Sequence, residues 1–181
     1  MNVIHHARPK ARRTARPNAF TLVEVLAVVL ILGILAALVV PSFSNATDMA
    51  RVSTLQEELR FMRSQTVGYI SEHYGVAPGY PGGISSATPT EATFIAQMTT
   101  HSTAHGATSA TANPLFPFGP YLRRMPTNPF NGENGVLVIA NGGAIPTDGD
   151  DSTGWIYKPQ TNQFLSNAAG TDPAGKKFIE Y

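Results

Sequence analysis

The sequence predicts an α+β fold in which one long N-terminal helix packs on a small antiparallel sheet within a loop-rich head. Three observations lead to this fold class. Apolar residues over positions 20–73 recur in patterns typical of a helix. Glycine and proline then cluster between Gly75 and Gly83, which ends that helix. The last third of the chain holds short runs of alternating apolar residues, which favour strands. A sheet packed on a helix buries both apolar faces.

The predicted helix starts with an apolar run of 21 residues, positions 20–40, interrupted by Thr21 and Glu24. At about 1.5 Å per residue such a helix spans about 30 Å, the hydrocarbon thickness of a bilayer. The 19 residues before the run carry five basic side chains and no acidic ones. A basic flank stays in the cytoplasm and orients the helix. We therefore expect residues 20–44 to form a transmembrane half, with the head outside the cytoplasmic membrane.

The carboxylate of Glu24 is the unusual feature of this run. A carboxylate in a membrane helix costs roughly 2.5–3.5 kcal/mol on insertion scales and is usually paired with a cation. The next basic residue along the chain is Arg51, about seven helical turns away. No cation of the same helix reaches Glu24, so we expect its partner to be another chain or a new N-terminus.

Residues 45–75 are predicted to form an amphipathic half of the helix. Before this half lies Pro41, which removes a backbone donor and is expected to kink the helix. The apolar residues that follow are spaced by three or four positions, which places them on one face. That predicted buried stripe consists of Val52, Leu55, Leu59, Met62, Thr66, Tyr69 or Ile70, and His73.

Residues 16–25, Arg-Pro-Asn-Ala-Phe-Thr-Leu-Val-Glu-Val, resemble the leader and N-terminal helix shared by type IV pilins and type II secretion pseudopilins. The resemblance implies that residues 1–19 are a basic class III prepilin leader, cut between Ala19 and Phe20 by a prepilin peptidase. It also implies N-methylation of Phe20. The family usually has glycine where this chain has Ala19.

The resemblance extends over roughly residues 12–60 and gives Glu24 a role in assembly. In the family, the carboxylate at this place pairs with the terminal amine of a neighbouring subunit, here that of Phe20. A helix-bending proline at the position of Pro41 is common in the same family. The resemblance therefore implies a subunit that polymerises through its N-terminal helix.

Two other targeting signals remain as alternatives for the N-terminal region. An ordinary secretory signal would be cut after the apolar run, where Ser44-Asn45-Ala46 offers small residues. The run is long for such a signal, and a discarded signal has no reason to retain Glu24. An uncleaved signal anchor is the second alternative. The prepilin interpretation is favoured because it explains the leader, Phe20 and Glu24 together.

The head, residues 76–181, is predicted to contain one short helix and several strands. Thr90 is the expected N-cap of a helix at 91–101. The low-complexity segment at 102–113 is predicted to be flexible. Further predictions for the head are a buried helix side of Phe94, Ile95 and Met98, strands at 135–140, 154–158 and 163–166, a C-terminal β-hairpin turning at 159–162, and a last strand at 178–181.

Two segments of the head resemble the major pseudopilins of type II secretion. One is Gly-Pro-Tyr-Leu at 119–122, followed by Pro-x-x-Pro at 126–129. The other is the Trp-x-Tyr-x-Pro-x-Thr-Asn-x-Phe pattern at 155–164. The chain has no cysteine, whereas many type IV pilins carry a C-terminal disulfide loop. A type II secretion pseudopilin is therefore the first hypothesis, with a type IV pilin or minor pilin as the alternative.

The balance of basic and acidic residues indicates which kinds of binding partner are expected. Of 13 basic residues, five lie in the leader, which leaves eight against 12 acidic residues and a net charge of −4 after cleavage. This balance argues against nucleic acid as a partner. The expected partners are copies of the chain in a homopolymer, minor pseudopilins, the inner-membrane secretion platform, prepilin peptidase and the membrane. The assembled pseudopilus is expected in the periplasm.

The sequence contains few features that are typical of an enzyme. There is no cysteine nucleophile, no Gly-x-Ser-x-Gly and no phosphate-binding loop. The histidines at 73, 101 and 105 show no metalloenzyme spacing with carboxylates. We predict that the protein is not an enzyme and that it needs no cofactor.

Two features leave other functions open. Asp148, Asp150 and Asp151 could hold calcium through oxygen ligands, and the resemblance implies calcium in the head because major pseudopilins often bind it there. The spacing is not that of an EF-hand, so a solvated acidic turn is favoured. A membrane-anchored head that binds carbohydrate is the other alternative, with an exposed Trp155 as the stacking residue, although core packing is favoured for Trp155.

Overall fold

A computed structural model describes residues 20–181, together with the side chains of all of these except residues 38–45. The predicted leader, with Ala19 of the predicted cleavage site, lies outside the described residues. Contacts divide the chain into two units, Met1–Ser42 and Phe43–Tyr181.

Helix α1, Leu22–Glu72, carries the predicted buried stripe in its second half. The stripe residues alternate in steps of four and three, which keeps them on one line of the helix. Residue Val52 at its start is half buried, and the rest are covered by the head. Six positions of the stripe expose 2% or less of their surface: Leu55, Leu59, Met62, Thr66, Tyr69 and His73.

The end of α1 is capped by a reversal of the backbone. Tyr74 and Gly75 have left-handed φ angles of 55° and 78°. The backbone N–H of Gly75 donates to the carbonyl of Ile70 at 3.0 Å, as in common helix C-terminal caps. A loop with one 3₁₀ turn, η1 (Pro81–Gly83), then leads to α2.

Helix α2, Glu91–Thr99, begins where the sequence predicted. The side-chain oxygen of Thr90 accepts the backbone N–H of Thr93 at 3.2 Å, which confirms Thr90 as the N-cap. The helix ends two residues earlier than predicted. Phe94 and Met98 are buried and Ile95 is half buried.

The segment after α2 is more ordered than the sequence suggested. Strands β1 (His101–Ser102) and β2 (Thr108–Ser109) pair in antiparallel fashion within the segment that was predicted to be flexible. The prediction is wrong here because Ser102 is tied to the core by its backbone and side chain. Its backbone pairs with Phe118, and its side chain is fully buried.

A three-stranded sheet forms the second layer of the head. Its order is β3 (Val136–Val138), β4 (Trp155–Lys158) and β5 (Gln163–Ser166). Strands β4 and β5 form the predicted antiparallel hairpin, joined by the 3₁₀ turn η2 (Pro159–Thr161). Strand β3 runs parallel to β4, so this sheet is mixed, whereas an antiparallel one was predicted.

The final residues also differ from the prediction. A strand was predicted at 178–181, but Phe178–Glu180 forms the 3₁₀ turn η3. Phe178 and Ile179 are consecutive and both buried. A strand would send one of them to each face, whereas Phe178 stacks on Phe130 and Ile179 packs in a cluster with Ile156.

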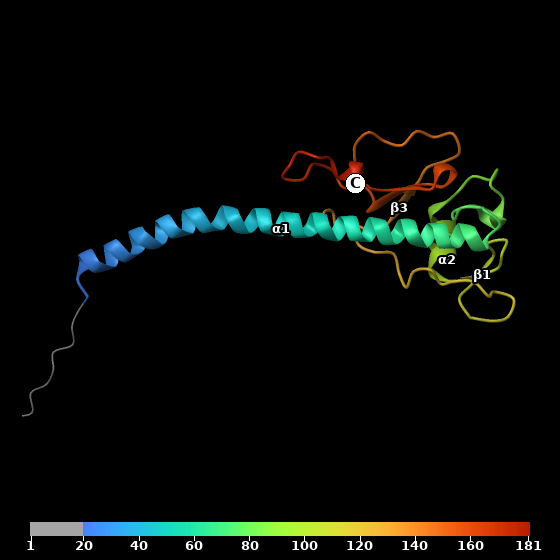
Figure 1. The fold of residues 1–181 in the computed structure, drawn as a ribbon, viewed down its shortest axis with the longest axis horizontal. Helices are drawn as coiled ribbons and strands as arrows, with labels where there is room; N and C mark the ends of the chain where they lie inside the picture. Colours follow the sequence, from blue (N-terminus) through green and yellow to red (C-terminus); the bar gives the residue numbers. More distant parts are fainter. Residues whose placement is uncertain (1–19) are drawn as a thin grey trace, which may run out of the picture. The chain divides into compact units, whose positions relative to one another are not determined.

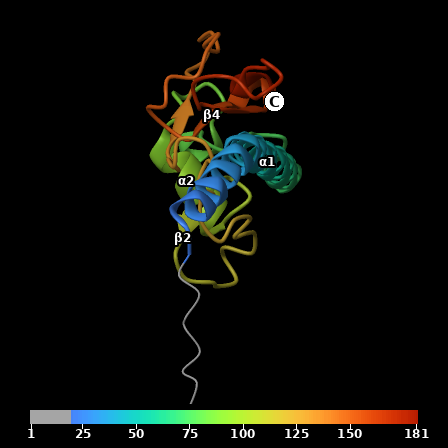
Figure 2. The same cartoon turned by 90° about the vertical axis from the view of Figure 1, so that its left-hand side faces the viewer.

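The core lies between the second half of α1, α2 and one face of the sheet. Figures 1 and 2 show α2 and the strands alongside this part of α1. Trp155 and Tyr157 point into this core, and Ile156 points to the opposite face, as period two requires. Trp155 has no exposed surface, and its indole N–H donates to the carbonyl of Pro126 at 2.9 Å. The stacking role considered for an exposed Trp155 is therefore wrong.

Candidate functional site

The start of α1 holds the most informative cluster of predicted site residues. Thr21 precedes the first helical residue, and Glu24 lies in the first turn. The Thr21 hydroxyl oxygen accepts the backbone N–H of Glu24 at 3.2 Å. In return, the Glu24 carboxylate accepts the backbone N–H and the hydroxyl of Thr21, both at 3.0 Å.

This reciprocal pairing of Thr21 and Glu24 is a capping box, in which each side chain satisfies a backbone donor of the other residue. The carboxylate also lies at the positive end of the helix dipole. Sequence reasoning gave Glu24 only an intermolecular role and missed this local one. The signal that could have found it is the spacing Thr-x-x-Glu at the start of an apolar run.

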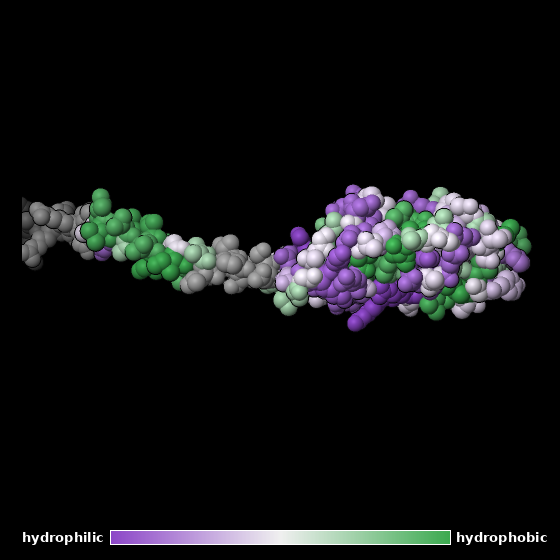
Figure 3. Space-filling model, turned by 90° about the horizontal axis from the view of Figure 1, so that it is seen from above, coloured by the Kyte–Doolittle hydropathy of each residue, from purple (hydrophilic) through white to green (hydrophobic). Residues whose placement is uncertain are grey.

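The apolar side chains around this cap are exposed. Phe20 exposes 81% of its surface, and every residue from 20 to 37 is classed as exposed. Figure 3 shows this segment as almost uniformly hydrophobic, while the visible face of the head mixes polar and apolar residues. Such a continuous apolar surface marks contact with a membrane or with other protein.

The predicted transmembrane run extends to residue 40, beyond the last described side chain of this segment. Within the residues that the structure describes, no helix combines the length and the apolar character needed to cross a bilayer. Pro41 falls within α1 but among the side chains at 38–45, which lie outside the description. The kink at Pro41 stays a prediction.

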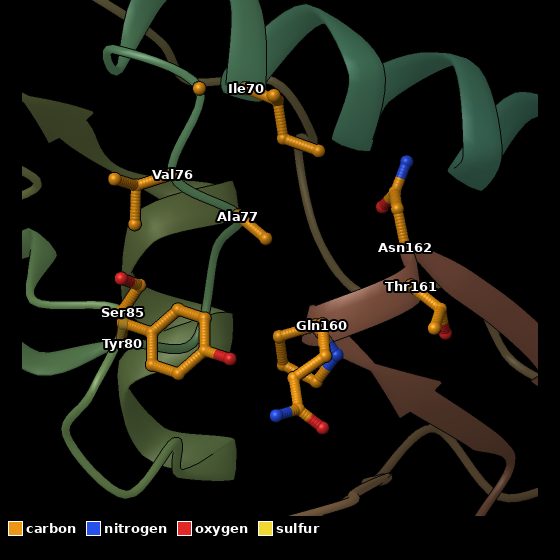
Figure 4. Close-up of a pocket in the computed structure, with 10 residues that line it drawn as sticks. Ile70, Val76, Ala77, Tyr80, Ser85, Gln160, Thr161 and Asn162 are labelled. Atoms are coloured by element: carbon orange, nitrogen blue, oxygen red, sulfur yellow. The ribbon is translucent and has the colours of Figure 1, made fainter. Parts of the chain in front are cut away.

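A cavity of about 550 Å³ in the head lies at the end of α1 beside the turn η2. Figure 4 shows Ile70, Ala77, Tyr80 and Gln160 around it. Its described lining contains neutral amide, hydroxyl and apolar side chains and no carboxylate, imidazole or amine. One of its polar groups is already engaged, since the hydroxyl of Tyr80 donates to Asn141. The cavity offers no acid and base pair for catalysis.

A histidine and a serine meet inside the head. His73 Nε2 lies 2.9 Å from Ser102 Oγ, and His73 Nδ1 lies 2.7 Å from the carbonyl of Tyr69. The carbonyl accepts the Nδ1 proton, so Nε2 accepts the serine hydroxyl. The imidazole stacks on the ring of Tyr69 with centroids 3.6 Å apart, and burial lowers its pKa. Both residues are buried, and the hydrogen bond between them connects β1 to the end of α1.

The three acidic residues proposed for calcium do not converge on one point. The Asp148 carboxylate pairs with Lys177 at 2.6 Å. Asp150 accepts from Ser152 and Asn167, and Asp151 accepts the backbone N–H of Ala169 at 2.8 Å. Calcium requires six to eight oxygens around one centre. In the described part of the chain, no group of three or more histidine or acidic side chains is arranged to hold a metal.

Comparisons with known proteins match the N-terminal segment. The pattern described as "Prokaryotic N-terminal methylation motif" matches residues 15–40. This match confirms the predicted resemblance to type IV pilin-like proteins. It covers the predicted cleavage site, Phe20 and Glu24.

One relative of known name comes from a type II secretion system. The chain is 46% identical over 43 residues to Type II secretion system core protein G of Pseudomonas aeruginosa. The matched segment covers 24% of this chain and 30% of the relative. A segment of the chain is thus similar to part of a type II secretion protein, and less than a third of that relative is covered. No solved structure shows a significant match to the chain.

Proposed function

We propose that the protein is a structural subunit of a type II secretion pseudopilus. A prepilin peptidase removes residues 1–19, Phe20 becomes the methylated N-terminus, and the subunit polymerises through the first half of α1. Minor pseudopilins and the inner-membrane secretion platform are the proposed partners of the resulting periplasmic filament.

The observation that carries this proposal is the exposed apolar segment with one carboxylate at its start. Glu24 is held beside Thr21, four residues from Phe20. Burying this carboxylate among apolar neighbours is costly unless a cation pairs with it. Cleavage after Ala19 would create an α-amine on Phe20, and that amine on an adjoining subunit supplies the cation.

Apolar packing supplies most of the association in this account, and the ion pair fixes the axial register. Gly33, Ala36 and Ala37 are exposed small residues that allow close approach of neighbouring helices. The matched relative is a core protein of a type II secretion system by name, which supports the same assignment for this chain.

The replacement Glu24→Ala tests the pairing. Membrane insertion should persist, because the apolar run is unchanged. Filament yield on overexpression should fall by about tenfold or more, since removing one partner of a desolvated ion pair costs more than about 1.4 kcal/mol. Filaments counted by electron microscopy provide the measurement.

The matched control is Thr21→Ala, which removes the local hydroxyl contact but keeps the carboxylate. It should retain far more filaments than Glu24→Ala. Normal filament yield from Glu24→Ala would contradict the pairing. Loss of insertion in Glu24→Ala would show that the carboxylate acts before assembly.

A further inference from the structure

The acidic turn at residues 148–152 is fixed by hydrogen bonds to the chain that follows β5. Asp150 Oδ1 accepts the hydroxyl of Ser152 at 2.6 Å and the side-chain amide of Asn167 at 2.8 Å. The backbone N–H of Ser152 donates to the same oxygen at 3.0 Å. These donors lower the pKa of Asp150, with the Ser152 hydroxyl the largest contributor. The carboxylate is therefore satisfied by protein donors.

Asn167 makes hydrogen bonds to several residues in and after this turn. Its side chain is 1% exposed, and its Nδ2 donates to Thr153 Oγ1 at 2.9 Å as well as to Asp150. Its backbone carbonyl accepts the N–H of Asp151 at 3.0 Å, and its own N–H donates to Gly154 at 3.1 Å. One buried asparagine after β5 thus holds Asp150 and Asp151 of the turn, together with Thr153 and Gly154 that follow it.

Toward the carboxylate of Asp150, the network presents donors. An amide NH₂ carries two protons and cannot ligate a cation through its nitrogen. The ammonium of Lys177 forms an ion pair with the carboxylate of Asp148, and this contact lowers the pKa of that carboxyl. A calcium site would need oxygen ligands at these positions.

The backbones of the turn and of the chain after β5 also approach too closely to leave space between them. A Cβ added to Gly149 would lie 2.3 Å from the carbonyl oxygen of Ala168 and 2.7 Å from that of Asn167. Glycine is required there because any side chain would collide with rigid backbone.

We propose that Asn167, together with Lys177, takes the place of a cation in fixing the acidic turn, so that the head of this protein folds and stays folded without calcium. The calcium that the family resemblance implies does not fit these residues. This inference concerns the head alone and does not rest on the proposed assembly function.

Thermal unfolding of the full-length protein in detergent, followed by the fluorescence of Trp155, tests the inference. The Tm of the unchanged protein should be the same within about 1 °C in calcium chloride and in excess EGTA, since no ligand-linked stabilisation is lost. A lower Tm in EGTA would overturn the proposal. This comparison uses the unchanged protein, so it does not depend on the folding of a variant.

The variant Asn167→Ala tests the amide. Its Tm should fall by about 4–8 °C, because Asp150 and Thr153 lose a buried donor, and calcium should not restore it. The control Asn134→Ala removes an exposed amide and should leave the Tm unchanged. An unchanged Tm in Asn167→Ala, or its recovery in calcium, would contradict the proposal.

Discussion

In the first half of α1, Leu26 and Leu30 expose about two thirds of their surface, whereas in the second half Leu55 and Leu59 expose 1% or less. The residues are the same and both segments are helical. What differs is the pattern around them. The first half is apolar on all sides, whereas the second carries one buried apolar stripe, and its other positions are mostly polar.

This difference shows which apolar side chains of α1 are buried by the rest of the chain. The stripe of the second half is buried by α2 and the sheet of the same chain. The described side chains of the first half, residues 20–37, are all exposed. The second half therefore contributes to the folding of the head, and in the proposed function the first half serves insertion and assembly.

The largest effect is expected from Leu59→Ala. The side chain is buried in the head core, and its loss should destabilise the head by about 2–5 kcal/mol. Urea unfolding followed by Trp155 fluorescence measures this change. A decrease in the free energy of unfolding of less than about 1 kcal/mol would contradict this contrast between the two halves, because the buried stripe would then contribute little to the stability of the head.

A smaller loss is expected from Gln97→Leu. The buried amide accepts the N–H of Gly79 at 2.7 Å and donates to the carbonyls of Tyr80 and Gly106. Leucine would leave these backbone groups unpaired, at about 1–3 kcal/mol. The control Gln65→Leu alters a half-exposed amide of α1 and should change the unfolding free energy by less than about 0.5 kcal/mol.

Acid should weaken the contact between β1 and the end of α1. Burial lowers the pKa of His73 below its unfolded value, while the backbone of Tyr69 and the nearby Glu72 carboxylate raise it by less. The folded head therefore binds the proton more weakly than the unfolded chain. The contribution of His73 is complete above its unfolded pKa of about 6.5 and is lost as the pH falls below that value.

Unfolding measured from neutral pH downward tests this dependence, with a slope of at most about 1.4 kcal/mol per pH unit for one proton. His73→Gln should flatten the slope in this range. His105→Gln, which changes an exposed histidine, should leave it intact. Equal slopes in the His73 variant and the unchanged protein would assign the effect to another group.

The smallest effect on the head is expected from Leu30→Ala, the counterpart of Leu59→Ala. Its side chain is exposed in the described structure, so head unfolding should change by less than about 0.5 kcal/mol. Filament yield should fall instead, because the side chain belongs to the surface proposed for assembly. A large loss of head stability would show that the two halves do not act separately.

Elements fixed by local chemistry could be predicted from the sequence. The stripe of α1 follows from its spacing, the start of α2 from Thr90, and the β4–β5 hairpin from its turn residues. The opposite faces of Trp155 and Ile156 follow from the two-residue period of a strand. Each depends on residues within a few positions of one another.

Features that depend on distant segments were missed. The parallel pairing of β3 with β4 requires a crossover of the chain between residues 138 and 155, which no short window shows. Gln97 and Asn167 are buried polar residues whose partners lie in other segments. The capping box of Thr21 and Glu24 was local and could have been found, but the intermolecular role of Glu24 had already been assigned.

The N-terminus of the native protein is the most direct test of the whole account. Mass spectrometry of protein purified from membranes should find a chain that begins at Phe20, carries one methyl group on its α-amine and retains Glu24. A chain that keeps residues 1–19, or one that begins after Ala46, would lack the amine that pairs with Glu24 and would contradict assembly through α1.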